Sequence, residues 1–325
     1  MKRSIHASFI AFLMSVFVLS ANAQGFPSRT VSIIVPFPPG GSADLFARAI
    51  APILSKTWGQ PVIVENRPGA GGNIAAQMAA RATPDGHTLF LAPDPVLSTN
   101  QLIYPKLPYD VKRDFAPVSR VVEFPSVIVV NASLGVKTLG ELQTLAKTNQ
   151  GKLNFSSFGI GTAPHIGMEM FNRVAGVDIV HVPYKGMADA VPALVAGDVQ
   201  VLFIGHSIAQ MGAIQEGRLR ILAVAGDHRS RLIPNVPTFA EAGFPTLKGP
   251  NFWGFVTQSK VPRAIIEKIN ADIVKALSDP GIVDRFVTKN GYELIGDTPE
   301  QFAARIQALT DIWAPVIKSA DIHLE

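Results

Sequence analysis

The sequence predicts an α/β fold, because short apolar strands alternate with helices along most of the chain. An apolar run at 31–35 leads through a Pro- and Gly-rich turn into a helix, and the same order returns from 60 to 82 and from 153 to 174. This rhythm is typical of a parallel sheet covered by helices. About 300 residues follow the N-terminal segment, which suggests two domains.

The first strand–turn–helix unit has the most distinctive turn. Prolines within 36–39 remove backbone donors, so the strand ends there, and Gly40 and Gly41 let another group approach the backbone closely. Free N–H groups and the positive end of the next helix dipole would point at one place. An ordinary strand-to-helix turn accounts for the spacing equally well. The anion site predicted here consists of Phe37, Pro39, Gly40, Gly41, Ser42 and Asp44.

Two residues at the start of this helix have specific expected roles. Ser42 is a good N-cap residue, and Asp44 in the first helical turn complements the helix dipole. Two further roles of Asp44 stay open, namely fixing the turn and accepting a hydrogen bond from a ligand amine or hydroxyl group. The turn is neither a dinucleotide fingerprint nor a P-loop, because it lacks both G-x-G-x-x-G and Gly-Lys-Ser/Thr.

Residues 1–23 are predicted to be a signal peptide. Lys2 and Arg3 precede an apolar stretch from Ala7 to Leu19, and Ala21-Asn22-Ala23 fits the small-x-small cleavage pattern. We expect cleavage after Ala23 and export to the periplasm. The apolar stretch is shorter than the ~20 residues of a spanning helix, which disfavours an uncleaved membrane anchor.

Composition narrows the function classes. The formal net charge is +4, and loss of Lys2 and Arg3 with the signal peptide would leave +2. Basic residues are scattered, so no nucleic-acid partner is expected. Hydrophobic residues make up 47% of the chain and charged residues 17%, which is enough apolar material for large cores. The absence of Cys excludes disulfides, a zinc–thiolate site and a cysteine nucleophile.

The alternation continues from 60 to 100. A strand at 60–66, a second Gly-rich turn at 67–73 and a helix at 74–82 precede a third strand at 88–91. Loops beyond the carboxyl ends of parallel strands line the crevice of an open sheet. Asp94 follows the third strand and is therefore a candidate specificity residue, although we favour a solvated loop acid here.

A second strand–turn–helix unit with polar turn residues follows at 153–174. It comes after an apolar strand at 125–130 and a helix that opens on the capping box Thr138-Leu139-Gly140-Glu141. The turn repeats the arrangement of the first one, with free amides and two hydroxyls at a helix start. We take Ser157, Gly159, Gly161 and Thr162 as a second anion-binding turn.

His165 lies at the start of the helix in this second unit. We favour a packed or capping histidine, and we keep ligand contact as the alternative. A metal site is not expected, because no Cys lies near it. A catalytic role is not expected either, because no G-x-S-x-G motif or evident nucleophile accompanies it. The sequence therefore predicts no metal, no cofactor and no catalytic residue.

Two later loops supply further candidate specificity residues. A strand at 177–182 leads into Tyr184 and Lys185, and a strand at 199–204 leads into His206 and Ser207. For Lys185 we slightly favour a surface cation over a contact with a carboxylate ligand.

Two long helices are expected near the C-terminus. Pro262 opens the first at position N1, and the capping box Thr298-Pro299-Glu300-Gln301 opens the last. Pro52 and Pro315 are predicted to kink or shorten the helices that contain them.

Several stretches together resemble one known family. PFPPGGSADLFAR at 36–48, ENRPGAGGNIAA at 65–76, LPYD at 107–110 and VPYKG at 182–186 are similar to signatures of the tripartite tricarboxylate transporter solute receptors, the Bug or TctC-like periplasmic binding proteins. The resemblance covers nearly the whole chain after about residue 24. Many members carry an acid after the Phe that matches Phe203. Here the residue is Ile204, where the chain is expected to cross a crevice.

The resemblance implies an α/β, two-lobed periplasmic binding protein fold of type II, in which each lobe is a mixed sheet flanked by helices. Lobe 1 would be discontinuous, comprising 24–125 plus 250–325, and lobe 2 would span 126–249. The crossings at 122–126 and 249–253 would form the hinge.

The resemblance also implies a function. The protein would be an extracytoplasmic receptor and not an enzyme. It would be a monomer that captures a small carboxylate between its two lobes. It would deliver that ligand to the membrane permease subunits of a tripartite tricarboxylate transporter. Two alternatives stay open. One is the same receptor serving a sensor kinase, and the other, less favoured, is a periplasmic hydrolase or isomerase that uses His165 or His206.

Overall fold

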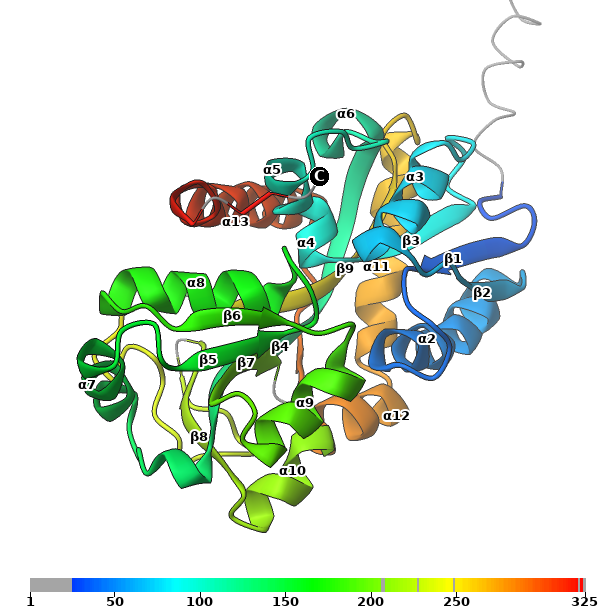
Figure 1. The fold of residues 1–325 in the computed structure, drawn as a ribbon. Helices are drawn as coiled ribbons and strands as arrows, with labels where there is room; N and C mark the ends of the chain where they lie inside the picture. Colours follow the sequence, from blue (N-terminus) through cyan, green and yellow to red (C-terminus); the bar gives the residue numbers. More distant parts are fainter. Residues whose placement is uncertain (1–24, 206–207, 227, 248, 321, 324–325) are drawn as a thin grey trace, which may run out of the picture.

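The computed structural model describes residues 25–205, 208–226, 228–247, 249–320 and 322–323. The predicted signal peptide with its cleavage site, as well as His206 and Ser207, lies outside these residues. Figure 1 shows two groups of strands and helices side by side, joined by the long strands β4 and β9. No helix within the described ranges is long and apolar enough to cross a membrane.

The first sheet has the strand order β2-β1-β3-β9-β4. Its first three strands run parallel, while β9 runs antiparallel to both β3 and β4, and the short β10 pairs antiparallel with β4. The sheet is therefore mixed, as expected. Its strands are β1 (Val31–Val35), β2 (Val62–Asn66), β3 (Thr88–Pro93), β4 (Phe115–Asn131), β9 (Pro250–Gln258) and β10 (Glu293–Leu294).

Helices cover both faces of this sheet. One face packs against α2 and α11, and the other packs against α3, the short helices α4 and α5, and α13. The helices of this part are α2 (Ser42–Trp58), α3 (Asn73–Ala80), α4 (Asp94–Leu97), α5 (Asn100–Ile103), α6 (Val111–Asp114), α11 (Arg263–Leu277), α12 (Pro280–Ile282) with the adjoining π-helical turn Val283–Thr288, and α13 (Pro299–Ser319).

The strand β4 belongs to both sheets. Its residues 115–125 pair with β9, whereas 126–131 pair with β7 and β8. The second sheet has the order β4-β7-β5-β6, with β8 on the other side of β4. Its other strands are β5 (Asn154–Ser157), β6 (Val180–Pro183), β7 (Val201–Gly205) and β8 (Leu219–Val224), and its helices are α7 (Leu139–Thr148), α8 (Ala163–Ala175), α9 (Met187–Ala196) and α10 (Ile208–Gln215).

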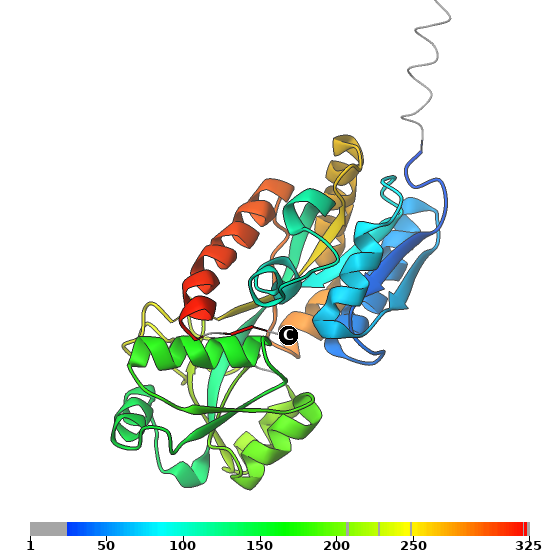
Figure 2. The ribbon, with the colours of Figure 1, turned by 45° about the horizontal axis from the view of Figure 1, so that its top comes forward.

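The helix α13 connects the two groups of elements. In Figures 1 and 2 it extends from the first sheet to lie beside α8 of the second. The Arg173 guanidinium of α8 donates hydrogen bonds of 2.7 Å to the Pro315 carbonyl and to the Ser319 hydroxyl. One apolar core accordingly runs across both sheets and includes Phe90, Phe155, Phe203, Phe302 and Trp313.

The two capping-box signals open their helices as predicted, but Pro262 takes the N-cap position of α11 instead of N1, and the proline stop signals are wrong. Thr298 and Gln301 form the reciprocal capping box of α13, and the Thr138 hydroxyl accepts a hydrogen bond from the Glu141 amide. Pro52 and Pro315, however, lie inside α2 and α13, which continue beyond them. Burial on both sides of each proline holds these helices together, because packing outweighs the one lost backbone hydrogen bond.

The β9 strand offers a test of the core packing. A Cβ at Gly254 would overlap the ring of Phe302, which is fully buried. We expect Gly254→Ala to lower the free energy of unfolding by ~1–3 kcal/mol, as overpacked cores do. Urea unfolding would measure it.

The matched control is Gly140→Ala in α7, where an added Cβ meets no atom within 4 Å. This substitution should stabilise the protein by up to about 1 kcal/mol through helix propensity. Equal stability of the two variants would contradict the packing argument.

Candidate functional site

The turn between β1 and α2 is held by the carboxylate of Asp44. Asp44 is 1% exposed, and its oxygens accept hydrogen bonds from the Gly40 amide (2.8 Å), the Arg48 Nε (2.9 Å) and the Asn66 side-chain amide (2.9 Å). Burial raises the pKa of Asp44, but these bonds from Arg48, Gly40 and Asn66 outweigh it and lower the pKa overall. Asp44 therefore fixes the turn, and its oxygens are already occupied.

This turn leaves the first amides of α2 without an intrahelical partner. The first helical hydrogen bond runs from the Leu45 amide to the Gly41 carbonyl, so the amides of Ser42, Ala43 and Asp44 precede the ladder. Phe37 and Pro39, like Gly40, Gly41 and Ser42, are exposed. The expectation that Ser42 caps the helix is wrong, because Gly41 takes the N-cap position in extended geometry and Ser42 becomes the first helical residue.

The turn between β5 and α8 is also held by its own polar groups. Ser157 is fully buried, and its Oγ lies 2.6 Å from His181 Nε2 and accepts a 3.1 Å hydrogen bond from the Gly159 amide. The Thr162 hydroxyl donates a 2.7 Å hydrogen bond to the Gly159 carbonyl. Gly159 and Gly161 have φ of 121° and 76°, which favours glycine. Both hydroxyls thus serve the shape of the turn in this structure.

His165 stands behind this second turn. Its Nδ1 accepts a 3.0 Å hydrogen bond from the Gly161 amide, and its ring stacks on that of His181 with centroids 3.8 Å apart. Burial lowers the pKa of His165 to about 3, helped by the neighbouring His181, and burial lowers the pKa of His181 to about 4. Both rings are neutral at pH 7, so His165 is a packed residue that supports the turn from within.

The helix α8 presents free amides in the same way as α2. Thr162 is its N-cap in extended geometry, and the first helical hydrogen bond runs from the Ile166 amide to the Thr162 carbonyl. The amides of Ala163 and His165 therefore have no intrahelical partner, while Pro164 has none to offer.

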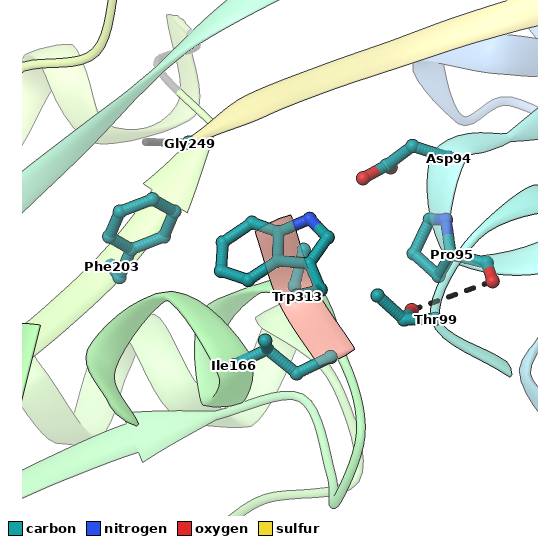
Figure 3. Close-up of a pocket in the computed structure, with 8 residues that line it drawn as sticks. Asp94, Pro95, Thr99, Ile166, Phe203, Gly249 and Trp313 are labelled. Atoms are coloured by element: carbon teal, nitrogen blue, oxygen red, sulfur yellow. Dashed lines mark hydrogen bonds between the residues drawn. The ribbon is translucent and has the colours of Figure 1, made fainter. Parts of the chain in front are cut away.

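A small cavity lies between elements of the two sheets. Its volume is about 10 Å³ for the centre of a water molecule, which is room for one ordered water. Figure 3 shows the Asp94 carboxyl pointing toward the indole nitrogen of Trp313 in this cavity. The lining residues are Asp94, Pro95, Thr99, Ala163, Ile166, Phe203, Gly249 and Trp313.

The favoured expectation of a solvated Asp94 is wrong. Asp94 is 5% exposed, because it begins the short helix α4 directly after β3 instead of lying in an open loop. Burial raises the pKa of Asp94 well above its ordinary value, the Arg305 charge opposes this rise, and Glu123 adds to it. A buried, neutral carboxyl can donate a hydrogen bond.

The remaining candidates lie in different places. The Tyr184 amide donates a 3.1 Å hydrogen bond to the Ser157 carbonyl, so the end of β6 lies beside the second turn. Tyr184 is half-buried and Lys185 is exposed. Ile204 does not cross a crevice as expected. It is 3% exposed and packs in the core on the opposite face of β7, because successive strand residues alternate between faces.

Sequence reasoning named none of the cavity walls Ile166, Phe203 and Trp313 as site residues, since their spacing is that of ordinary buried residues. Among the described residues, no group of three His, Cys, Asp or Glu side chains could hold a metal ion.

The buried histidine makes a testable prediction about pH. Between pH 6.5 and about 3 the unfolded chain binds a proton at His165 that the folded chain does not, so stability should fall as the pH is lowered. His165→Asn keeps an acceptor for the Gly161 amide and does not titrate. We expect wild type to lose roughly 1–2 kcal/mol more than this variant between pH 7 and pH 5 in urea unfolding. Equal losses would contradict the assignment.

Comparisons with known proteins agree with this architecture. The family model described as tripartite tricarboxylate transporter family receptor matches residues 46–322. Protein BugT of Bordetella pertussis is 34% identical over 94% of this chain and 93% of its own length.

Two solved structures of Rhodopseudomonas palustris proteins have the same fold. One, solved with adipate, is 30% identical over 92% of this chain and 99% of its own, with a TM-score of 0.80. The other, MatC with bound malate, is 32% identical over 90% of this chain and all of its own, with a TM-score of 0.77. The two-lobed periplasmic binding protein fold is confirmed, and the chain belongs to the tripartite tricarboxylate transporter receptors, a family of periplasmic solute-binding receptors that includes the Bug proteins.

Proposed function

We propose that this protein captures a small carboxylate between two lobes and delivers it to a tripartite tricarboxylate-type membrane permease. The observation that carries the proposal is the pair of helix starts, α2 and α8, which follow Gly-rich turns on different sheets and keep free first-turn amides. Helix N-termini with free amides favour carboxylates. The adipate and malate bound by the R. palustris relatives support this ligand class.

We further propose the lobe division 24–125 plus 250–325 and 126–249, with the hinge at 122–126 and 249–253. It is supported by β4, which changes its pairing partner between Pro125 and Ser126, and by β9, which returns the chain to the first sheet at Pro250. A ligand held by amides of both lobes would favour the closed form, because only that form satisfies both sets of donors.

The residues around the two turns then divide into two roles. The amides of Ser42, Ala43, Ala163 and His165 would contact the ligand. The side chains of Asp44, Ser157, Thr162 and His165 would hold those amides in position, as their hydrogen bonds support. Neutral donors suit this task, since a buried cation would need partners of its own.

The proposal includes cleavage of the signal peptide after Ala23, a monomeric receptor in the periplasm, and binding without a cofactor or a chemical step. One contact favours the enzyme alternative, because Ser157 and His181 lie within hydrogen-bond distance like a nucleophile and its base. Ser157 is fully buried, however, and its oxygen also accepts from the Gly159 amide, so a substrate has no access to it. A sensor kinase as the recipient would use the same binding site.

The ligand class can be tested on the purified secreted protein, unfolded and refolded to remove bound ligand. We expect carboxylates to raise the melting temperature, and a ligand at a hundredfold excess over its Kd should stabilise by about 2.7 kcal/mol. The uncharged amide of each acid serves as its control. A panel of C3 to C6 mono-, di- and tricarboxylates without a shift would contradict the proposal.

The two helix starts can be tested by removing single amides. Ser42→Pro and Ala163→Pro each delete a first-turn N–H, and proline fits position N1 after the extended residues Gly41 and Thr162. We expect each to weaken carboxylate binding by about 1.5–3 kcal/mol in calorimetry, typical of a hydrogen bond to a charged group.

Ser42→Ala and Ala163→Gly keep the amides and are the matched controls, which should bind normally. Ser42→Ala also removes the hydroxyl that contacts Tyr292, so it separates the side chain from the backbone. Normal binding by both proline variants would remove these amides from the site.

A further inference from the structure

Asp94 brings a buried carboxyl with no partner from another residue into the cavity between the lobes. Within the described part of the chain, the carboxyl has a hydrogen bond only with its own backbone, no other residue donates to it or forms an ion pair with it, and Asp94 is 5% exposed. Buried polar groups in proteins are normally paired, and an unpaired one needs an explanation. A ligand atom in the cavity would supply the missing partner.

The opposite wall supplies a second polar group. Figure 3 shows the carboxyl pointing toward the indole nitrogen of Trp313, and no hydrogen bond joins the two. The indole N–H can only donate. Of the other lining side chains, Pro95, Ile166 and Phe203 are apolar, and the Thr99 hydroxyl already donates to the Pro95 carbonyl at 3.5 Å. A group that enters between Asp94 and Trp313 must therefore accept a hydrogen bond.

The protonation of Asp94 makes it a second donor. An ionised carboxylate that is buried and forms no ion pair is costly, so the neutral acid is favoured. Burial raises the pKa of Asp94 well above its ordinary value, in agreement with this geometry, although the Arg305 charge acts in the opposite direction. The carboxyl O–H and the indole N–H then converge on one small space.

We propose that Asp94 and Trp313 form an oxygen-binding subsite, in which a hydroxyl or keto oxygen next to the ligand carboxylate accepts hydrogen bonds from both side chains. The inference rests on the proposed function, because the adjoining carboxylate would occupy the free amides of α8. Ala163 belongs to both the cavity and the start of α8, since it lines the cavity and carries one of the free amides. The preferred ligands are therefore hydroxy- or ketocarboxylates.

The size and polarity of the cavity exclude other substituents. Its room for about one water molecule suits a single oxygen atom and not a longer branch. An ammonium group would bring its own donors against the indole N–H and would require Asp94 to ionise. Amino acids with the same carbon skeleton should bind more weakly for this reason.

Calorimetry with two matched ligand series tests the preference. The four-carbon series is succinate, malate, oxaloacetate and aspartate, and the five-carbon series is glutarate, 2-hydroxyglutarate, 2-oxoglutarate and glutamate, with adipate added. In at least one series we expect the hydroxy or keto acid to bind wild type about tenfold or more tightly than both the plain diacid and the amino acid, as for one or two added hydrogen bonds.

Four variants then assign the preference to the subsite. Asp94→Ala and Trp313→Phe should each remove the preference, bringing the hydroxy or keto acid to the affinity of the plain diacid. Asp94→Asn keeps a neutral donor of the same size and should retain most of it. Asp311→Asn changes an exposed acid on the same helix and should behave as wild type.

The outcomes separate this inference from the proposed function. Binding of plain diacids or adipate without any preference for an oxygen substituent would overturn the subsite and leave the carboxylate receptor standing. A preference for the amino acid, or an Asp94→Asn variant as impaired as Asp94→Ala, would show an ionised Asp94 and would also overturn it. Binding of none of these acids would overturn the subsite as proposed, and only the absence of a shift across the wider panel of mono-, di- and tricarboxylates would overturn the receptor function as well.

Discussion

Buried hydrogen bonds behind each Gly-rich turn give the site its shape. Behind the first turn, Asp44 takes up the Gly40 amide and ties it to Arg48 and Asn66. Behind the second, Thr162 and His165 hold the Gly159 carbonyl and the Gly161 amide. With the turns fixed in this way, the next amides point out of the helix starts without partners. A donor set that is already ordered costs little entropy when an anion binds.

Local chemistry made the positions of both turns predictable. Each turn has proline or glycine between an apolar run and a helix start, and these residues leave the backbone few alternative conformations. The structure has its strands and helices where these signals place them. The roles of the side chains were harder, because they depend on partners far along the chain. Asn66 reaches Asp44 from β2, and His181 reaches Ser157 from β6. No spacing rule in a single sequence reveals such contacts.

The cavity lay beyond sequence reasoning for a related reason. Its walls come from five separate segments of the chain, including the start of α4, the centre of β7 and the C-terminal half of α13. Phe203 and Ile204 illustrate how fine the distinction is, since neighbouring residues of one strand face opposite sides. Asp94 was a candidate because it follows a predicted strand, but its burial depends on the packing of α13 and α8, which the sequence does not show. Trp313 has the spacing of any residue on the apolar face of a helix.

The charges around the strand crossing explain why a neutral Asp94 fits its surroundings. On β4, Arg120 pairs with Glu123 and, at 2.9 Å, with Asp297, while Arg305 of α13 lies 3.8 Å from Glu123. Two guanidinium groups are thus matched by two carboxylates, and burial already raises the pKa of Glu123. An ionised Asp94 would add a third carboxylate to two guanidinium groups, and the Arg305 charge only partly offsets the cost of its burial, since the pKa of Asp94 stays well above its ordinary value. The charges near the strands β4 and β9 therefore favour a neutral Asp94. In that state the Asp94 carboxyl can donate a hydrogen bond to a ligand oxygen.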